Sequence, residues 1–389
     1  MKMHIKHEIT KEILPRYLQA NKQEKKKILD EFSATTGYHR KSAIRKLKDL
    51  QMTPYHKDSI AGKHSKNRER IYDGYVEEVV MKIYQVLNGI GAKRIHPIIN
   101  QVLDKGIEFG HLKVDLITEM KVRKISKSTL DRMIVRIKER SVIKGISTTR
   151  PGKFLKSEIP LRVGVWEESS PGFTEIDLVA HCGDNAAGLF ISTLNTSDIA
   201  TGWFEAEPVM GKSQERVLVC LKNIHSRLPF KLLGIDSDNG SEFINYQLYG
   251  YCKKENIIFT RSRPYKKNDN AHIEQKNYTQ VRQVLGYQRF ETKEVFEMIK
   301  ELYTGPLRLY INFFQPSMKC IDKIRTGSKI RKTYDIALTP YGRIMLHTKI
   351  PKKTKEMLTH LFNNLDPFAL KQEIDVLIKK IQKDSKYHL

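Results

Sequence analysis

The sequence is poor in cysteine, in tryptophan and in long apolar runs. Four cysteines occur in 389 residues, far apart, at Cys182, Cys220, Cys252 and Cys320. None forms a CxxC pair or a His/Cys cluster with zinc-finger spacing, so we expect reduced thiols in a cytoplasmic protein. The first residues, MKMHIKHEITKEIL, contain no apolar signal segment, and no run approaches the roughly 18 apolar residues of a membrane span. Export and membrane insertion are therefore not expected.

Acidic residues are few relative to basic ones. The chain has 69 Lys and Arg against 44 Asp and Glu, and its net charge is +25. Residues 1–150 contain 33 of the basic and 17 of the acidic residues. A surface of this sign attracts polyanions, because phosphates that bind to it release their condensed counterions. The charge predicts a nucleic-acid partner, bound mainly through the N-terminal part.

A chain of this length is expected to form several domains, and residues 1–60 have the pattern of a helix-turn-helix. Apolar positions from Ile28 to Phe32 predict one helix, Thr36-Gly37 predicts a turn, and Ala43 to Leu47 predict the inner face of a second helix. The outer face of the second helix is basic, with Arg40, Lys41, Arg45 and Lys46. Such a helix is typical of a DNA recognition helix; a solvated helix in an ordinary bundle is the alternative.

A second helical DNA-binding unit is predicted at residues 66–145, after a polar linker. Two apolar stripes precede a third helix, which is expected to begin near Ser128 with this residue as its cap. The basic positions expected to contact DNA on this helix are Lys127, Arg132 and Arg136. Residues 146–168 contain Pro and Gly without a sustained period and are predicted as an interdomain linker.

From Pro171 the pattern becomes that of strands. Strands are predicted at 173–181, 188–196 and 200–209, with a turn formed by Asn195, Thr196, Ser197 and Asp198 before the third. The elements predicted next are a helix at 213–228, a strand at 231–235, a helix at 241–255, a strand at 257–260 and a final helix. This order is that of a ribonuclease H-like mixed α/β sheet, assigned here to residues 169–304.

Three carboxylates fall in this segment where they could share metal ions. Asp177 lies in the first predicted strand, Asp238 follows an apolar run in GIDSDNGSEFIN, and Glu274 lies in a helical pattern, 35 residues intervening after Asp238. Carboxylate oxygens suit divalent cations that must grip a phosphate. Asp236 shares a strand face with Asp238 and competes for its role. The DNG sequence and the 35-residue gap favour Asp238.

The strand-borne Asp177, the SDNGSEF segment at 237–243 and the spacing to Glu274 resemble the catalytic core of retroviral integrases and of related DDE transposases from bacterial insertion sequences. The resemblance covers roughly residues 160–345, and the tandem helix-turn-helix start is also similar. It implies an enzyme, a polynucleotidyl transferase that cleaves the ends of its DNA element and joins them to target DNA.

The resemblance also implies the site and its partners. Two Mg²⁺ ions, replaceable by Mn²⁺, are expected on Asp177, Asp238 and Glu274 as catalytic and metal-binding residues. Water attacks first, and the freed 3′-hydroxyl then attacks the target without a covalent protein intermediate. Joining two ends implies a homo-oligomer, at least a dimer, on double-stranded DNA. Lys266, Lys267 and Lys276 surround Glu274 and are expected to hold the DNA backbone.

The remaining residues, 305–389, are predicted as a basic arm and a C-terminal helix with Asp366 as cap and Pro367 at its first position. Gly211-Lys212-Ser213 resembles the end of a P-loop, but Ala206 stands where the motif needs glycine, so no nucleotide cofactor is predicted. The predicted location is the bacterial cytoplasm, at the nucleoid. Two alternatives remain open: a transposase-derived DNA-binding regulator without activity, and a ribonuclease H-like nuclease for structured nucleic acid.

Overall fold

The structure is a computed structural model of the full chain. It describes residues 3–51, 71–139, 170–238, 240, 242–262, 273, 276–326 and 329–386. The chain divides into two compact units, Met1–Ile71 and Tyr72–Leu389. The division coincides with none of the predicted domain boundaries, which remain predictions.

The first unit consists of three helices, α1 (Met3–Gln19), α2 (Lys22–Thr36) and α3 (Arg40–Gln51). Asn21 begins α2 with a capping box, in which its side chain accepts from the Glu24 amide and Glu24 accepts in return. Gly37 ends α2 at φ 71°, a left-handed conformation that glycine adopts without strain. The two helices and the turn predicted at these positions are present, and they enclose a small core of Leu29, Phe32, Ala43 and Leu47.

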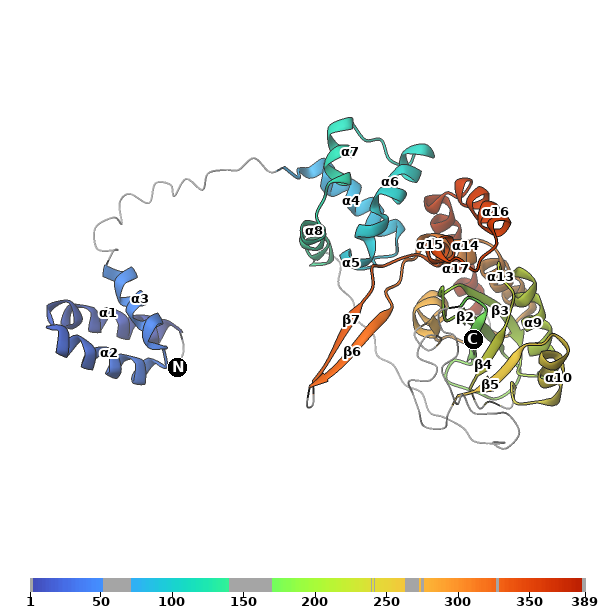
Figure 1. The fold of residues 1–389 in the computed structure, drawn as a ribbon, viewed down its shortest axis with the longest axis horizontal. Coiled ribbons are helices and arrows are strands. Elements are labelled where there is room, and N and C mark those ends of the chain that lie inside the picture. The colour runs from blue at the N-terminus through green and yellow to red at the C-terminus, as the bar shows by residue number, and fades with distance from the viewer. Residues whose placement is uncertain are drawn as a thin grey trace. The chain divides into compact units, whose positions relative to one another are not determined.

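The second unit begins with a helical region that Figure 1 shows as a group of its own. Its elements are α4 (Gly74–Val86), α5 (Ala92–Ile95), the 3-10 turn η1 (His96–Ile98), α6 (Ile99–Glu108), α7 (Leu116–Arg123) and α8 (Lys127–Glu139). Asp73 and Asp115 cap α4 and α7. The start of α8 differs from the prediction: Ser126, not Ser128, accepts the Thr129 amide at 3.2 Å, because α8 begins earlier.

A five-stranded mixed sheet follows, in the order β3-β2-β1-β4-β5. Its strands are β1 (Phe173–Ala180), β2 (Ile191–Asp198), β3 (Phe204–Met210), β4 (Gly234–Ser237) and β5 (Ile258–Arg261). The first three pair antiparallel, while β4 and β5 run parallel to β1. This is the predicted ribonuclease H-like arrangement, and it brings distant segments of the sequence beside β1.

Helices cover both faces of the sheet. On one face, α9 (Gln214–Arg227) and α10 (Tyr246–Lys254) share a buried cluster with Ile176, Leu194 and Val209 of the sheet. The other face meets the π-helical segment η2 (Asn277–Arg282), α12 (Gln283–Leu285), α13 (Lys293–Thr304) and α14 (Pro306–Phe314). Asp177 pairs in register with Asn195, and it lies on this second face with η2.

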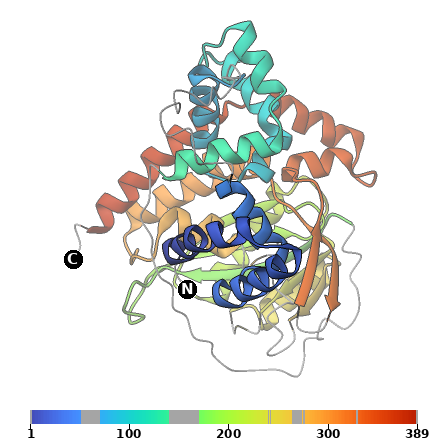
Figure 2. The same ribbon diagram turned by 90° about the vertical axis from the view of Figure 1, so that its left-hand side faces the viewer.

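The chain ends with the strands β6 (Cys320–Thr326) and β7 (Lys329–Tyr334) and the helices α15 (Pro340–Leu346), α16 (Lys352–Asn363) and α17 (Pro367–Lys386). Asp366 caps α17 as predicted, accepting the Phe368 amide at 2.9 Å. In Figure 2 the red α17 runs beside the cyan helices α4–α8, and it packs on α4 and α6 as well as on α13 and α14. In the parts of the chain that the structure describes, no helix has the length and apolarity of a membrane span.

The predicted turn at Asn195–Asp198 is wrong. All four residues lie in β2 and are buried. The turn comes later, where the Asp198 carboxylate accepts from the amides of Gly172 and Thr201 at 2.7 Å each. The strand forms in spite of this turn propensity, because β2 pairs with both β1 and β3 and the Asn195 amide and the Asp198 carboxylate have hydrogen-bond partners inside the protein. The helix predicted at 241–255 is shorter in the structure. It begins at Tyr246, where the Asn245 side chain accepts the Leu248 amide at 2.8 Å as the cap of α10.

Candidate active site

Asp177 lies within β1, the central strand of the sheet, with its side chain partly buried. One carboxylate oxygen accepts the Leu178 amide at 2.8 Å, and the other accepts the side-chain amide of Asn277 on η2. Burial raises the pKa of this carboxyl, the two hydrogen bonds oppose that rise, and the negative charge of Glu242 adds to it. Asp177 is thus an oriented carboxylate beside other negative charge.

Asp238 lies next to Asp177 because of strand register. The parallel pairing of β1 and β4 sets Ile176 opposite Ser237, so the following residues, Asp177 and Asp238, continue side by side. The Gly240 amide donates to Asp238 at 2.9 Å. Burial and then the charge of Asp177 raise the pKa of Asp238 to about 6. The structure therefore brings these two predicted residues together.

Glu242 is a further acid at this point, which the sequence analysis missed. A Cβ atom on Gly240 would lie 2.8 Å from a Glu242 carboxylate oxygen and 3.0 Å from Asp238. The absence of a side chain at Gly240 thus lets the two carboxylates approach. Glu242 also raises the pKa of both Asp177 and Asp238. The available signal was a second acid four residues after Asp238 in SDNGSEF.

Glu274, the third predicted acid, lies outside the described residues, but its neighbours on either side contact β1 and β2. The Ile273 amide donates to the Glu175 carboxylate at 2.9 Å. Asn277 accepts from the Asn195 side chain at 2.7 Å while donating to Asp177. Asn277 was also missed; its signal was a polar residue three positions after Glu274, on the same side of a helix.

Asp236, the alternative to Asp238, has a different environment. It is fully buried within β4, and it accepts from the Thr260 hydroxyl on β5 at 2.5 Å. Asp238 follows the end of the strand and is partly exposed. A carboxylate that binds an incoming cation must be reachable, and of Asp236 and Asp238 only Asp238 has this placement.

The described acids have the type of oxygen ligand that a divalent cation binds. Among the described residues, no three His, Cys, Asp or Glu side chains gather closely enough to hold a metal ion. Asp177 and Asp238 are nevertheless hard oxygen donors whose charges disfavour each other, and a cation between two such groups relieves that repulsion. The donor set therefore fits magnesium or manganese.

The predicted DNA-contacting residues of the first unit lie on α3. Lys41, Arg45 and Lys46 are exposed. Arg40 is half-buried and forms an ion pair with Asp30 of α2. Three cations of the predicted set thus remain on the outer face of the helix after the turn, as a recognition helix requires.

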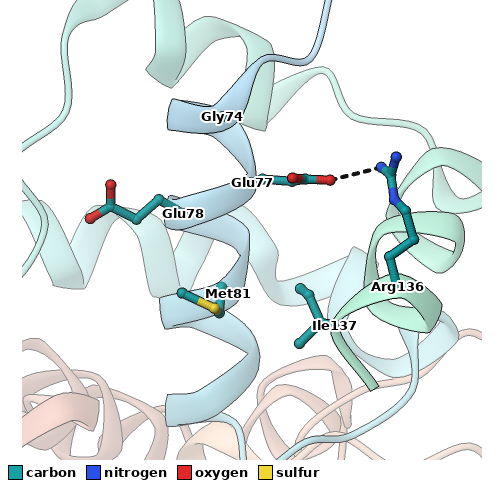
Figure 3. Close-up of a pocket in the computed structure, with 6 residues that line it drawn as sticks. All are labelled: Gly74, Glu77, Glu78, Met81, Arg136 and Ile137. Carbon is teal, nitrogen blue, oxygen red and sulfur yellow. Dashed lines mark ion pairs between the residues drawn. The ribbon is translucent and has the colours of Figure 1, made fainter. Parts of the chain in front are cut away.

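On α8, Lys127 and Arg132 are exposed, while Arg136 takes part in an ion pair. Arg136 donates to Glu77 of α4 across 2.9 Å, at a cavity of about 190 Å³ between the two helices. Figure 3 shows this pair with the other lining residues, Gly74, Glu78, Met81 and Ile137. A cation held by a neighbouring carboxylate is less available to phosphate than a solvated one.

Lys276, predicted to hold the DNA backbone, lies beside an aromatic ring of the sheet. Its side chain is half-buried, with the ammonium 5.9 Å from the centre of the Phe204 ring. Burial, with Arg94 and Arg343 nearby, lowers the pKa of Lys276 to about 8. The ammonium thus lies against a buried ring, and its contact with DNA stays a prediction. Lys266 and Lys267 lie outside the described residues.

The sheet, with three antiparallel strands and two strands parallel to the first, has a ribonuclease H-like fold. The chain belongs to the same family as the uncharacterized protein y4rM of Sinorhizobium fredii. The two are 36% identical over 346 residues, which cover 88% of this chain and 95% of that protein. No protein-family model matches the chain.

Two solved structures are similar to part of this chain. The catalytic core domain of BIV integrase is 15% identical, covers 50% of this chain and 99% of its own, and superposes with a TM-score of 0.31. The catalytic core domain of HTLV-2 integrase, in complex with magnesium, is 13% identical, covers 38% and 90%, and has a TM-score of 0.29.

Proposed function

We propose that this protein is a DNA transposase that binds the ends of its element, cleaves them and joins them to target DNA. The observation that carries the proposal is the juxtaposition of Asp177 and Asp238 at the parallel β1/β4 pair of a ribonuclease H-like sheet. Two neighbouring carboxylates that each disfavour the ionised form of the other lower the stability of the fold. Such a pair is therefore expected to have a role in chemistry and not in stability.

Glu274 is proposed as the third acid. In support, the residues that flank it, Ile273 and Asn277, are held to Glu175 and Asp177 of β1. Glu242 adds negative charge to the same place. When bound there, magnesium or manganese would supply charge neutralisation for displacement at phosphorus.

The protein's own residues orient the reactants. Asn277 and the Leu178 amide fix the Asp177 carboxylate, and the Gly240 amide fixes Asp238. Such preorganised hydrogen bonds limit the motion of each acid before substrate arrives. Exposed cations of α3 and α8 are proposed to bind the DNA ends and so set which phosphate reaches the acids.

The proposal is tested with the full chain, Mg²⁺ and DNA from the flanks of its own gene. Asp177→Asn, Asp238→Asn and Glu274→Gln are each expected to lower nicking and strand transfer at least about 1000-fold, because each removes an ionised ligand. Affinity for the DNA ends is expected to stay within about twofold, since none of these acids contributes a positive charge. Asp184→Asn, at an exposed loop position, is the matched control.

End binding by a wild-type chain that neither nicks nor joins DNA with Mg²⁺ or Mn²⁺ would favour the inactive regulator. Nicking without strand-transfer products would favour the nuclease. Full activity in any one of the three acid variants would remove that residue from the proposed site.

A further inference from the structure

The strands β6 and β7 form an antiparallel ribbon that leaves the body of the second unit (Figures 1 and 2). Among the described residues, the extensive contacts of these two strands are with each other. Ile321, Ile324 and Tyr334 are exposed by 64%, 53% and 48%. An isolated two-stranded hairpin is only marginally stable in water, so a ribbon of this kind is expected to be completed by a partner.

The base of the ribbon is fixed to the body. The Asp335 carboxylate accepts from the Lys319 amide at 2.6 Å and from the Arg343 guanidinium at 2.7 Å. The Lys319 ammonium in turn donates to the Ile199 carbonyl at 2.5 Å, in the turn after β2. These bonds hold the start of the ribbon in place, while residues 320–322, 324–326 and 331–334 are exposed. The ribbon therefore extends from a base that is fixed to the body of the second unit.

The ribbon is strongly basic. Residues 320–334 contain five basic residues (Lys323, Arg325, Lys329, Arg331 and Lys332) and one acid, Asp322. Like charges gathered on one hairpin repel each other, and a bound polyanion relieves that repulsion. The composition therefore favours an anionic partner over a second copy of this chain, whose net charge is +25.

Basic residues occur on both faces of the ribbon. Arg331 and Lys332 are consecutive in β7 and both are exposed, so their side chains leave from opposite faces. A partner with a single flat surface would meet only one of them. A groove of double-stranded DNA has phosphates along both walls, and its major groove is wide enough for a two-stranded ribbon.

From these observations we infer that the β6–β7 ribbon binds in a groove of double-stranded DNA, as a contact surface distinct from the acid site and from the helices α3 and α8. The inference rests on the proposed function, since it takes the DNA substrate as the partner. The seven residues of β6 extend about 24 Å at roughly 3.4 Å per residue, which is about two-thirds of a helical turn of DNA. Exposed Ile321 and Ile324 supply apolar contact for sugars and base edges.

The test compares Arg331→Gln/Lys332→Gln with Lys352→Gln/Lys353→Gln in the full chain. Each removes two exposed positive charges, from β7 and from α16 respectively. Duplex binding is measured by fluorescence anisotropy between about 50 and 200 mM salt. The ribbon variant is expected to bind at least about tenfold more weakly at 0.1 M salt, with a salt slope smaller by about 2. The α16 variant is expected to retain the wild-type slope.

Equal affinities and slopes for the two variants would overturn the inference. So would an unchanged DNA affinity together with a lower oligomeric mass in sedimentation without DNA, because the ribbon would then contact a second copy. Should the double variant melt early, Arg331→Gln and Lys332→Gln are tested singly, each with an expected slope change of about 1. A wild-type chain that binds no duplex would refute the proposed function too, whereas active nicking with an unaffected ribbon variant refutes the inference alone.

Discussion

At the scale of single residues, the acid site is a place where charge opposes folding. Asp238 has a folded-state pKa of about 6, against 3.8 for the ordinary side chain, because of burial and the charge of Asp177. In the absence of a cation, ionising this carboxyl therefore lowers the stability of the folded chain. The penalty is fully present above about pH 6 and absent below pH 3.8.

Asp238→Asn is accordingly expected to raise the melting temperature by about 2–4 °C at pH 7.5 without divalent cations, since relief of part of the pKa shift is worth on the order of 1 kcal/mol. The gain should shrink as the pH falls toward 4. Differential scanning fluorimetry at several pH values measures it, with Asp184→Asn as an exposed control. Magnesium at about 10 mM should stabilise the wild type and not Asp238→Asn. A lower melting temperature for Asp238→Asn at pH 7.5 would contradict the account.

At the scale of elements, an ionic network ties the edge strand β3 to the helices α9 and α14. Glu205 is fully buried and accepts from Arg308 at 2.6 Å, from Arg227 at 3.1 Å and from the Trp203 indole at 3.0 Å. Arg227 also donates to Glu207. The edge of the sheet is thereby held to helices that cover it, and its ladder side is less open to other strands.

Glu205→Gln keeps the shape of the side chain but removes its charge, leaving two arginines without their shared carboxylate. We expect a loss of about 3 kcal/mol in the free energy of unfolding, as for other buried pairs that lose one member. Urea denaturation followed by tryptophan fluorescence provides the measurement, and Glu215→Gln on the exposed side of α9 is the matched control. Equal midpoints for the two variants would show that the network adds no net stability.

At the scale of the whole molecule, α17 joins parts of the second unit that are far apart in the sequence. Its residues Leu370, Ile374, Leu377 and Ile381 belong to the same buried cluster as α4–α8, α13 and α14. The helical region before the sheet and the helices on the sheet therefore share one core. Folding of these parts is expected to be cooperative.

Ile381→Ala and Val376→Ala test this on one helix. Ile381 is fully buried, whereas Val376 is 44% exposed. Ile381→Ala should cost about 2–4 kcal/mol by leaving a cavity, and Val376→Ala less than about 1 kcal/mol. Limited proteolysis should show 71–139 and 170–386 becoming susceptible together in Ile381→Ala. Cleavage confined to one of the two ranges would show that they unfold separately.

The sequence was most informative where a signal is local. The period of apolar residues predicted α2, α9 and the strands of the sheet, and the alternation of strand and helix predicted their order. It failed at Asn195–Asp198, where polar residues typical of turns lie in a buried strand. Turn propensity is a property of a few neighbouring residues, and it cannot register partners that only the folded sheet supplies.

For the candidate site, too, some features can be read from the sequence and others only from the structure. The types and spacing of Asp177, Asp238 and Glu274 are written in the sequence, as is the basic charge that predicts a DNA partner. Only the tertiary structure decided that Asp238 continues beside Asp177, that Glu242 and Asn277 join them, and that the Lys276 ammonium lies against a buried ring. Residue types and spacings are fixed along the chain, but which side chains share a volume depends on strand register and helix packing, which form only when distant segments meet.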